Sequence, residues 1–262
     1  MKRRTTLHTL VGIAVLGLTT LAACKKESAD PMPDPTAPVA GKAGFLIGKV
    51  TDPQGRPLPR ATVYIDNTVL VGRGAEVTSG SDGSYKMALV AGAGQWVAKG
   101  FILKSYNDRV YKILLDPENP DSFSEDEKPV RNFQWKLTGH IPDLSLDLYY
   151  GGTAELLRDP NAEGLNDDEN IEFTFKPVGP LIDGSAGKTL TLKAKRRYDS
   201  FLRDIPIGRY EISAVYKPTG EKLLVADGWG DLEYKTSVVL DFLGTEASYR
   251  ANSMGIGYTN RR

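Results

Sequence analysis

From Gly44 onward, apolar and polar residues alternate in short runs that are rich in β-branched and aromatic side chains. Gly, Pro, Asn and Asp interrupt these runs, and no run of useful length has the apolar period of a helix. Alternation with a period of two gives a strand one buried and one exposed face. The pattern therefore predicts an all-β chain of short antiparallel strands. In the first half of the chain the runs are FLIGKVT, ATVYID, AEVTS, SYKMAL, QWVAKGFIL, RVYKILL and RNFQWKL.

The same texture continues in the second half with LSLDLYY, IEFTF, KTLTLKAKRR, SFLRDI, YEISAVY, KLLVAD and YKTSVVLDF. Short strands with turn signals at this spacing are typical of sandwiches. The stretch around His140 is read as a joint, so we expect two tandem antiparallel β-sandwich domains of Ig-like or prealbumin-like form, over residues 44–137 and 138–245. Residues 246–262 have little apolar pattern and end in Asn-Arg-Arg, which predicts a loosely held tail.

Two motifs carry a resemblance to a known family. GKVTDPQGRPLPRATVYI (Gly48–Ile65), followed by TSGSDGSYKM (Thr78–Met87), resembles the carboxypeptidase regulatory-like domain, a small prealbumin-like β-sandwich common in secreted and lipid-anchored bacterial proteins. FLRDIPIGRYEISAVY (Phe201–Tyr216) resembles the signature that closes many prealbumin-like domains. The resemblance implies a carbohydrate-binding-like fold and glycan binding. It implies no catalysis, because this domain is an appendage without zinc ligands.

The matched residues also have physical roles. Asp52-Pro53-Gln54-Gly55 is expected to form a β-turn, since Pro presets φ and Gly can take a positive φ. Asp82-Gly83 should close a hairpin that leads into Tyr85, whose ring should cap the core.

The start of the chain has the layout of a signal peptide, with three basic residues before an apolar stretch, Leu10–Leu18. That stretch is about half of the roughly 20 residues that a bilayer-spanning helix needs. Leu21-Ala22-Ala23-Cys24 resembles the lipobox of bacterial lipoproteins, which implies cleavage after residue 23 and a lipid anchor on Cys24. Residues 24–43 are rich in Pro, Ala and charge, and are expected to be a flexible linker.

The residues after Cys24 indicate where the anchor lies. Lys25 departs from the Asp that often retains lipoproteins in the inner membrane of enteric bacteria, so the resemblance points to the outer membrane of the cell envelope. Lys25-Lys26-Glu27 also resembles a signal for export to the cell surface in Bacteroidetes. The resemblance therefore leaves two positions open for the anchored protein, one facing the periplasm and one exposed on the cell surface.

The composition of the chain argues against nucleic-acid binding and against several kinds of catalytic site. Without residues 1–23, which hold three basic and no acidic residues, 30 basic residues face 33 acidic ones, so no nucleic-acid partner is implied. Cys24 is the only cysteine, which leaves no thiol for a disulfide. Of the two histidines only His140 follows the signal, which excludes a Cys-His pair or a multi-histidine zinc site. We expect no cofactor, no metal and no enzymatic activity.

Trp229 is the most suggestive candidate for ligand binding. It lies between two glycines and is flanked by Asp227 and Asp231, so its ring could stack on a sugar while the carboxylates accept hydroxyl groups. Packing against the adjoining sheet or the other domain is the structural alternative. Tyr149 and Tyr150 are further candidates for stacking on a sugar.

Two acidic segments, Asp116–Pro129 and Asn166–Asn170, raise the question of calcium binding. The ligands in Asp116–Pro129 do not have EF-hand spacing, so a solvated loop is favoured there. Asn166–Asn170 is either part of a calcium site or, as favoured here, a polar hairpin tip.

These features predict a non-catalytic, lipid-anchored envelope protein that serves as a binding, adhesion or assembly module, with a glycan or an outer-membrane protein as partner. One alternative is an accessory subunit of an outer-membrane transport system. Another is a glycoside hydrolase that uses paired carboxylates such as Asp227 and Asp231.

Overall fold

The computed structural model describes residues 40–70, 72, 74–141, 147–197 and 199–261. Every regular element in these ranges is a strand, apart from three short 3₁₀ helices, so the all-β prediction is confirmed. The described residues belong to one compact unit. No helix in the described ranges is long and apolar enough to cross a membrane. The predicted signal peptide, Cys24 and the linker as far as residue 39 lie outside the described residues.

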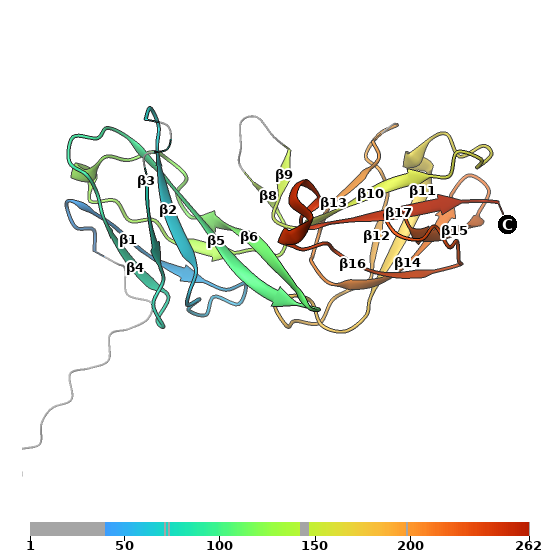
Figure 1. The fold of residues 1–262 in the computed structure, drawn as a ribbon, viewed down its shortest axis with the longest axis horizontal. Coiled ribbons are helices and arrows are strands. Elements are labelled where there is room, and N and C mark those ends of the chain that lie inside the picture. The colour runs from blue at the N-terminus through green and yellow to red at the C-terminus, as the bar shows by residue number, and fades with distance from the viewer. Residues whose placement is uncertain (1–39, 71, 73, 142–146, 198, 262) are drawn as a thin grey trace, which may run out of the picture. The chain divides into compact units, whose positions relative to one another are not determined.

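The first sheet has seven strands in the order β3-β2-β5-β6-β7-β1-β4 (Figure 1). Neighbouring strands are antiparallel, except that β1 and β7 are parallel. Buried side chains alternate with more exposed ones along β5, because one face of the sheet lines the core of a sandwich. The strands are β1 (Phe45–Thr51), β2 (Thr62–Asn67), β3 (Gly74–Thr78), β4 (Ser84–Ala88), β5 (Trp96–Tyr106), β6 (Arg109–Pro117) and β7 (Phe133–Trp135).

The turns of this sandwich use the residues that the motif singles out. The Gly55 amide donates to the Asp52 carbonyl oxygen over 2.9 Å, which closes the predicted β-turn. The Asp52 carboxylate accepts the Gln54 amide over 2.9 Å and thereby stabilises the same turn. Tyr85 is buried, and its hydroxyl donates to the Arg131 carbonyl oxygen over 2.5 Å, so the predicted cap of the core is confirmed.

The second sheet repeats the strand order of the first, as β12-β11-β14-β15-β17-β10-β13, and β10 and β17 again form a parallel pair (Figure 1). A further strand, β16, pairs with β14. Edge-to-face aromatic pairs, Phe173 with Tyr258 and Phe175 with Tyr210, fill its core. The strands are β10 (Gly152–Arg158), β11 (Ile171–Pro177), β12 (Leu190–Leu192), β13 (Phe201–Ile205), β14 (Arg209–Tyr216), β15 (Glu221–Asp227), β16 (Val238–Asp241) and β17 (Ser253–Thr259). The expectation of two sandwiches is therefore confirmed.

Short elements complete the fold. β8 (His140–Ile141) and β9 (Leu148–Tyr149) form a two-stranded sheet between the two sandwiches in the sequence. The 3₁₀ helices are η1 (Glu125–Glu127), η2 (Asp168–Asn170) and η3 (Thr245–Arg250).

The prediction of a loosely held tail over residues 246–262 is wrong from Ser253 to Thr259. These residues form β17, which lies between β15 and β10 inside the second sheet. Met254, Ile256 and Tyr258 are buried. The glycines between them lower the hydrophobicity of the segment, but they let neighbouring side chains pack directly on the strand. A strand with alternating glycines therefore lacks the apolar signal that its position would suggest.

Hydrogen bonds join the two sandwiches near the turn between β5 and β6. The buried Tyr111 hydroxyl donates to the Phe242 carbonyl oxygen over 2.7 Å. The Tyr106 hydroxyl donates to the Pro180 carbonyl oxygen over 2.9 Å and accepts the Arg209 amide over 3.1 Å. Because a buried hydroxyl without a partner is costly, these bonds stabilise the contact between the sandwiches.

Candidate ligand-binding site

The second sheet divides along β14. The first half of β14 pairs with β16, and the second half pairs with β15. A cavity of about 380 Å³ lies at this division. It is lined by residues of β15, β16 and β17, by the loop at Trp229, by Arg250 and by Arg109 at the start of β6. Both sandwiches therefore contribute to one cavity.

Trp229 lines this cavity and is held by its own chain. The indole Nε1–H donates to Glu155 Oε2 over 3.1 Å. A Cβ added at Gly255 would lie 2.7 Å from the indole carbons, so the ring rests on the backbone of β17 where only glycine leaves room. The Arg250 guanidinium carbon lies 4.5 Å from the ring centroid. Packing against the adjoining sheet accounts for the position of Trp229, and its remaining surface faces the cavity.

Asp227 lines the same cavity, and its carboxylate shapes the turn that carries the indole. Asp227 Oδ1 accepts the amides of Trp229 and Gly230, over 3.0 and 3.1 Å. Its other oxygen, Oδ2, has no hydrogen-bond partner among the described residues. Asp231 is exposed and does not line the cavity. These two residues therefore do not form the facing carboxylate pair that a glycosidase needs there.

Asp241 is the second carboxylate of the cavity, and it is fully engaged. Arg209 donates to Asp241 Oδ2 through Nε over 3.0 Å and through Nη2 over 2.7 Å. Asn107, from the β5–β6 turn of the first sandwich, donates to Asp241 Oδ1 over 2.8 Å. Hydrogen bonding to Asp241 raises the pKa of the Arg209 guanidinium. Asp241 thus links the two sandwiches through its hydrogen bonds.

Two arginines complete the polar lining. Arg109 lies 3.6 Å from Glu246 and donates to the Phe242 carbonyl oxygen over 3.4 Å. Arg250 stacks on Trp229, and its guanidinium carbon lies 5.4 Å from the ring centroid of Tyr249. Sequence reasoning missed Arg250 because it lies in the predicted tail. The alternation of large residues and glycines in SMGIGYT was the one signal that could have marked the following residues as a strand.

The two adjacent tyrosines lie away from this cavity. Tyr150 is buried, and its hydroxyl donates to Asp116 Oδ1 over 2.6 Å. Burial, followed by the hydrogen bond to Asp116, raises the pKa of Tyr150. The Tyr149 hydroxyl accepts a hydrogen bond from Lys195 Nζ over 2.9 Å, and its ring contacts the exposed His140 edge to face. Of the five predicted ligand-binding residues, only Trp229 and Asp227 meet in one cavity.

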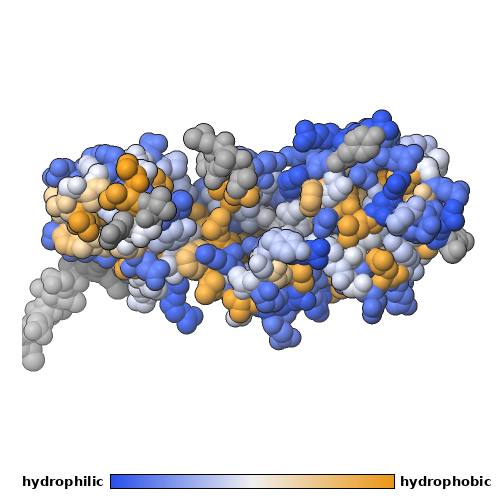
Figure 2. All heavy atoms as spheres, turned by 45° about the horizontal axis from the view of Figure 1, so that its top comes forward, coloured by the Kyte–Doolittle hydropathy of each residue, from blue (hydrophilic) through white to orange (hydrophobic). Residues whose placement is uncertain are grey.

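Tyr150 instead lines an apolar cavity of about 280 Å³ with residues of β5, β6 and β9. Leu114 and Leu148, both partly exposed, belong to this lining. Figure 2 shows hydrophobic residues gathered at the surface over β5 and β6. The one charged residue of the lining, Lys99, pairs with Asp66 over 3.1 Å. The cavity therefore has few polar groups that could orient a ligand.

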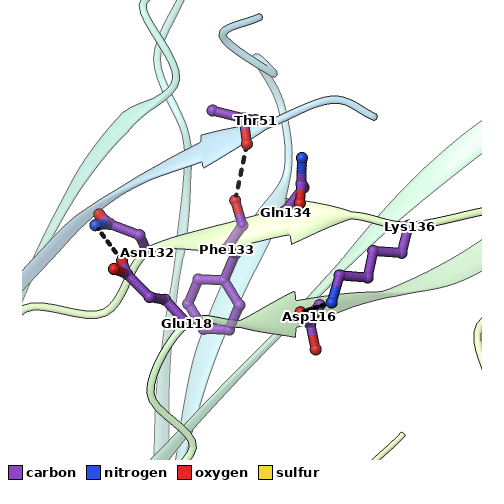
Figure 3. Close-up of a pocket in the computed structure, with 7 residues that line it drawn as sticks. All are labelled: Thr51, Asp116, Glu118, Asn132, Phe133, Gln134 and Lys136. Atoms are coloured by element: carbon purple, nitrogen blue, oxygen red, sulfur yellow. Dashed lines mark hydrogen bonds and ion pairs between the residues drawn. The ribbon is translucent and has the colours of Figure 1, made fainter. Parts of the chain in front are cut away.

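A further cavity, of about 330 Å³, lies along β7 (Figure 3). Lys136 and Asp116 face each other across it as an ion pair. Asn132 Nδ2 donates to Glu118 Oε2 over 2.8 Å. Because both carboxylates are engaged, this cavity does not present a free acid and base to a substrate.

Residues of both acidic segments form hydrogen bonds with other parts of the chain. Most of Asp116–Pro129 is exposed, but Phe123 is fully buried and exchanges two backbone hydrogen bonds with Trp96. The segment is therefore anchored to the sandwich rather than solvated throughout. In Asn166–Asn170, Asp168 accepts a hydrogen bond from the buried Tyr258 hydroxyl. Within the described ranges, no three or more His, Cys, Asp or Glu side chains gather where they could hold a metal ion.

No protein-family model and no curated protein matches the chain. Among solved structures, the Bacillus anthracis TIE protein is 16% identical over 84% of this chain and 34% of its own, with a TM-score of 0.32. The pilus adhesin SpaC from Lactobacillus rhamnosus GG is 10% identical over 83% of this chain and 29% of its own, with a TM-score of 0.26. A B repeat unit of the collagen-binding surface protein of Staphylococcus aureus is 10% identical over 84% of this chain and its whole length (100%), with a TM-score of 0.22.

The chain thus spans about a third of the length of the first two proteins, at 34% and 29%. TM-scores this low do not establish a common fold. The resemblance to the carboxypeptidase regulatory-like domain stays a prediction.

Proposed function

We propose that this chain is a non-catalytic, lipid-anchored binding module of the bacterial cell envelope, in which the two sandwiches act together. The observation that carries the proposal is the cavity at Trp229, because residues of both sandwiches line it, Arg209 binds Asp241, and backbone amides bind one oxygen of Asp227. Such a cavity suits binding better than acid–base chemistry.

A glycan is the proposed ligand of this cavity. Sugars present apolar ring faces together with hydroxyl groups, and binding sites meet them with aromatic walls and a few placed polar groups. Trp229 supplies the part of its indole that β17 and Arg250 leave uncovered, Asp227 Oδ2 supplies an acceptor without a donor among the described residues, and Arg250 supplies a set of donors.

Cys24 is the proposed anchor, in the outer membrane on either its periplasmic or its external side. Two or three acyl chains on one residue hold a protein stably on a membrane, whereas one chain does not. In membrane fractionation of bacterial cells, the full chain should sediment with membranes and Cys24→Ser should not. Mass spectrometry of the wild-type chain that finds an unmodified Cys24 behind an intact signal would overturn the anchor.

Crosslinking in intact cells followed by purification of the full chain tests the binding role. Recovery of a polysaccharide, lost in Trp229→Ala, supports the proposal. Recovery of an outer-membrane transporter instead favours the accessory role. Release of reducing sugar from oligosaccharides by the purified chain would overturn the non-catalytic assignment.

A further inference from the structure

Aromatic rings, rather than carboxylates, hold Arg250 in the wall of the cavity. Its guanidinium carbon lies 4.5 Å from the centroid of Trp229 and 5.4 Å from that of Tyr249, within the range of cation–π contacts. No carboxylate or carbonyl oxygen of the described residues accepts a hydrogen bond from it. A guanidinium stacked in this way keeps its charge and its planar set of N–H donors for another acceptor.

Two of the other charged residues around the cavity are paired with an opposite charge. Asp241 is bound by Arg209, and Arg109 lies beside Glu246. Asp227 forms no ion pair within the described residues and is held by two backbone amides. Among the described residues, Arg250 is therefore the cation of this cavity without an anionic partner, and Asp227 Oδ2 is an acceptor without a donor.

We infer that this cavity binds the anionic residue of an acidic saccharide, whose carboxylate forms paired hydrogen bonds with the Arg250 guanidinium. Arginine suits this role because its fork matches the geometry of a carboxylate. A ring hydroxyl of the same sugar donates to Asp227 Oδ2, and its apolar edge contacts Leu240 and Met254, which also line the cavity. The inference deepens the proposed function and depends on glycan binding. A volume of about 380 Å³ is enough for a small ligand, since ligand pockets begin at roughly 300 Å³.

Calorimetric titration of the detergent-solubilised full chain with tetragalacturonate and with neutral tetragalactose isolates the effect of the carboxylate. The acidic saccharide should bind at least about tenfold more tightly, because hydrogen bonds between charged groups are stronger than neutral ones. Added salt should weaken this preference, since Arg250 is only partly buried. A hyaluronate tetrasaccharide and a sulfated heparin tetrasaccharide identify whether glucuronate or sulfate serves as well as galacturonate.

Variants assign the preference to Arg250. Arg250→Gln should abolish it, and Arg250→Lys should keep part of it, because lysine retains the charge without the fork. Arg196→Gln is the matched control, since Arg196 is an exposed arginine of the same sandwich that does not line the cavity. Unchanged thermal unfolding of all three variants verifies that they are folded.

Equal affinity for the acidic and neutral saccharides, or a preference that survives Arg250→Gln, overturns the inference and leaves glycan binding in place. Binding of a peptide with a free terminal carboxylate at this cavity, and of neither saccharide, also overturns it. The crosslinking experiment judges the binding role separately, so the two proposals can fail independently.

Discussion

Gly255 shows how one missing side chain positions the candidate site. The indole of Trp229 occupies the space that a Cβ at this residue would fill, at 2.7 Å from the ring carbons. The indole in turn supports the Arg250 guanidinium. A residue without a side chain therefore determines where an aromatic ring and a cation lie.

We expect Gly255→Ala to push Trp229 off β17 and to lower the free energy of unfolding by about 1–3 kcal/mol, the usual cost of overpacking. Tryptophan emission should shift to the red, and the change reports on Trp229 because Trp96 and Trp135 are buried elsewhere. Urea unfolding and fluorescence measure the two effects. Gly80→Ala is the control, since the nearest atom to its Cβ would be 3.3 Å away. Unaltered emission in Gly255→Ala would contradict the packing described for the indole.

At the scale of elements, β17 is a central strand of the second sandwich. It is parallel to β10 on one side and antiparallel to β15 on the other, so it connects two parts of the sheet. Its large side chains reach the core, where Tyr258 meets Phe173. Removing it would expose two strand edges and open the core.

A chain that ends at Asn252 should therefore lose the folded second sandwich, because the loss of a central strand exceeds the roughly 5–15 kcal/mol that stabilises a domain. Limited proteolysis and circular dichroism measure this loss. A chain that ends at Thr259 is the matched control and should keep the sandwich. Equal protease resistance of the two chains would restore the description of this segment as a tail.

For the whole molecule, the two sandwiches share hydrogen bonds and a cavity instead of being joined only by the chain. Tyr111, Tyr106 and Asn107 all reach from the β5–β6 hairpin region to the second sandwich. We expect the described part to unfold as one cooperative unit while these bonds are present.

The double variant Tyr106→Phe and Tyr111→Phe should separate this unfolding into two transitions in differential scanning calorimetry. Each lost hydroxyl leaves a carbonyl oxygen at the contact without its donor, at a cost of about 1–3 kcal/mol where the group is buried. Tyr249→Phe is the control, because Tyr249 is 86% exposed. A single transition at the wild-type temperature would mean that these bonds do not couple the sandwiches.

Alkaline pH should destabilise both sandwiches, because burial raises the pKa of tyrosines in each of them above the ordinary value of 10.0. These tyrosines are Tyr85, Tyr111, Tyr150, Tyr210 and Tyr258. Above pH 10 the unfolded chain releases protons that the folded chain keeps. The free energy of unfolding should thus be undiminished below pH 10 and fall above it, by up to about 1.4 kcal/mol per pH unit for each tyrosine. Urea titrations across this range, with tyrosinate absorbance, measure both quantities. Tyrosinate that forms well before unfolding would contradict the expected burial.

The sequence alone determined the features that depend on neighbouring residues. Period-two alternation predicted the strands, because side chains on a strand point alternately to its two faces. Asp, Pro and Gly at fixed offsets predicted the turn at Asp52 and the hairpin that leads into the buried Tyr85, because turn residues act through local backbone geometry. Only the tertiary structure decided that residues 253–259 are a central strand and that Arg250 lies on Trp229. It also decided that Asp227 lines the cavity whereas Asp231 does not. Those outcomes depend on which distant segments pair in the sheet, and a local pattern of apolar and polar residues does not specify such pairing.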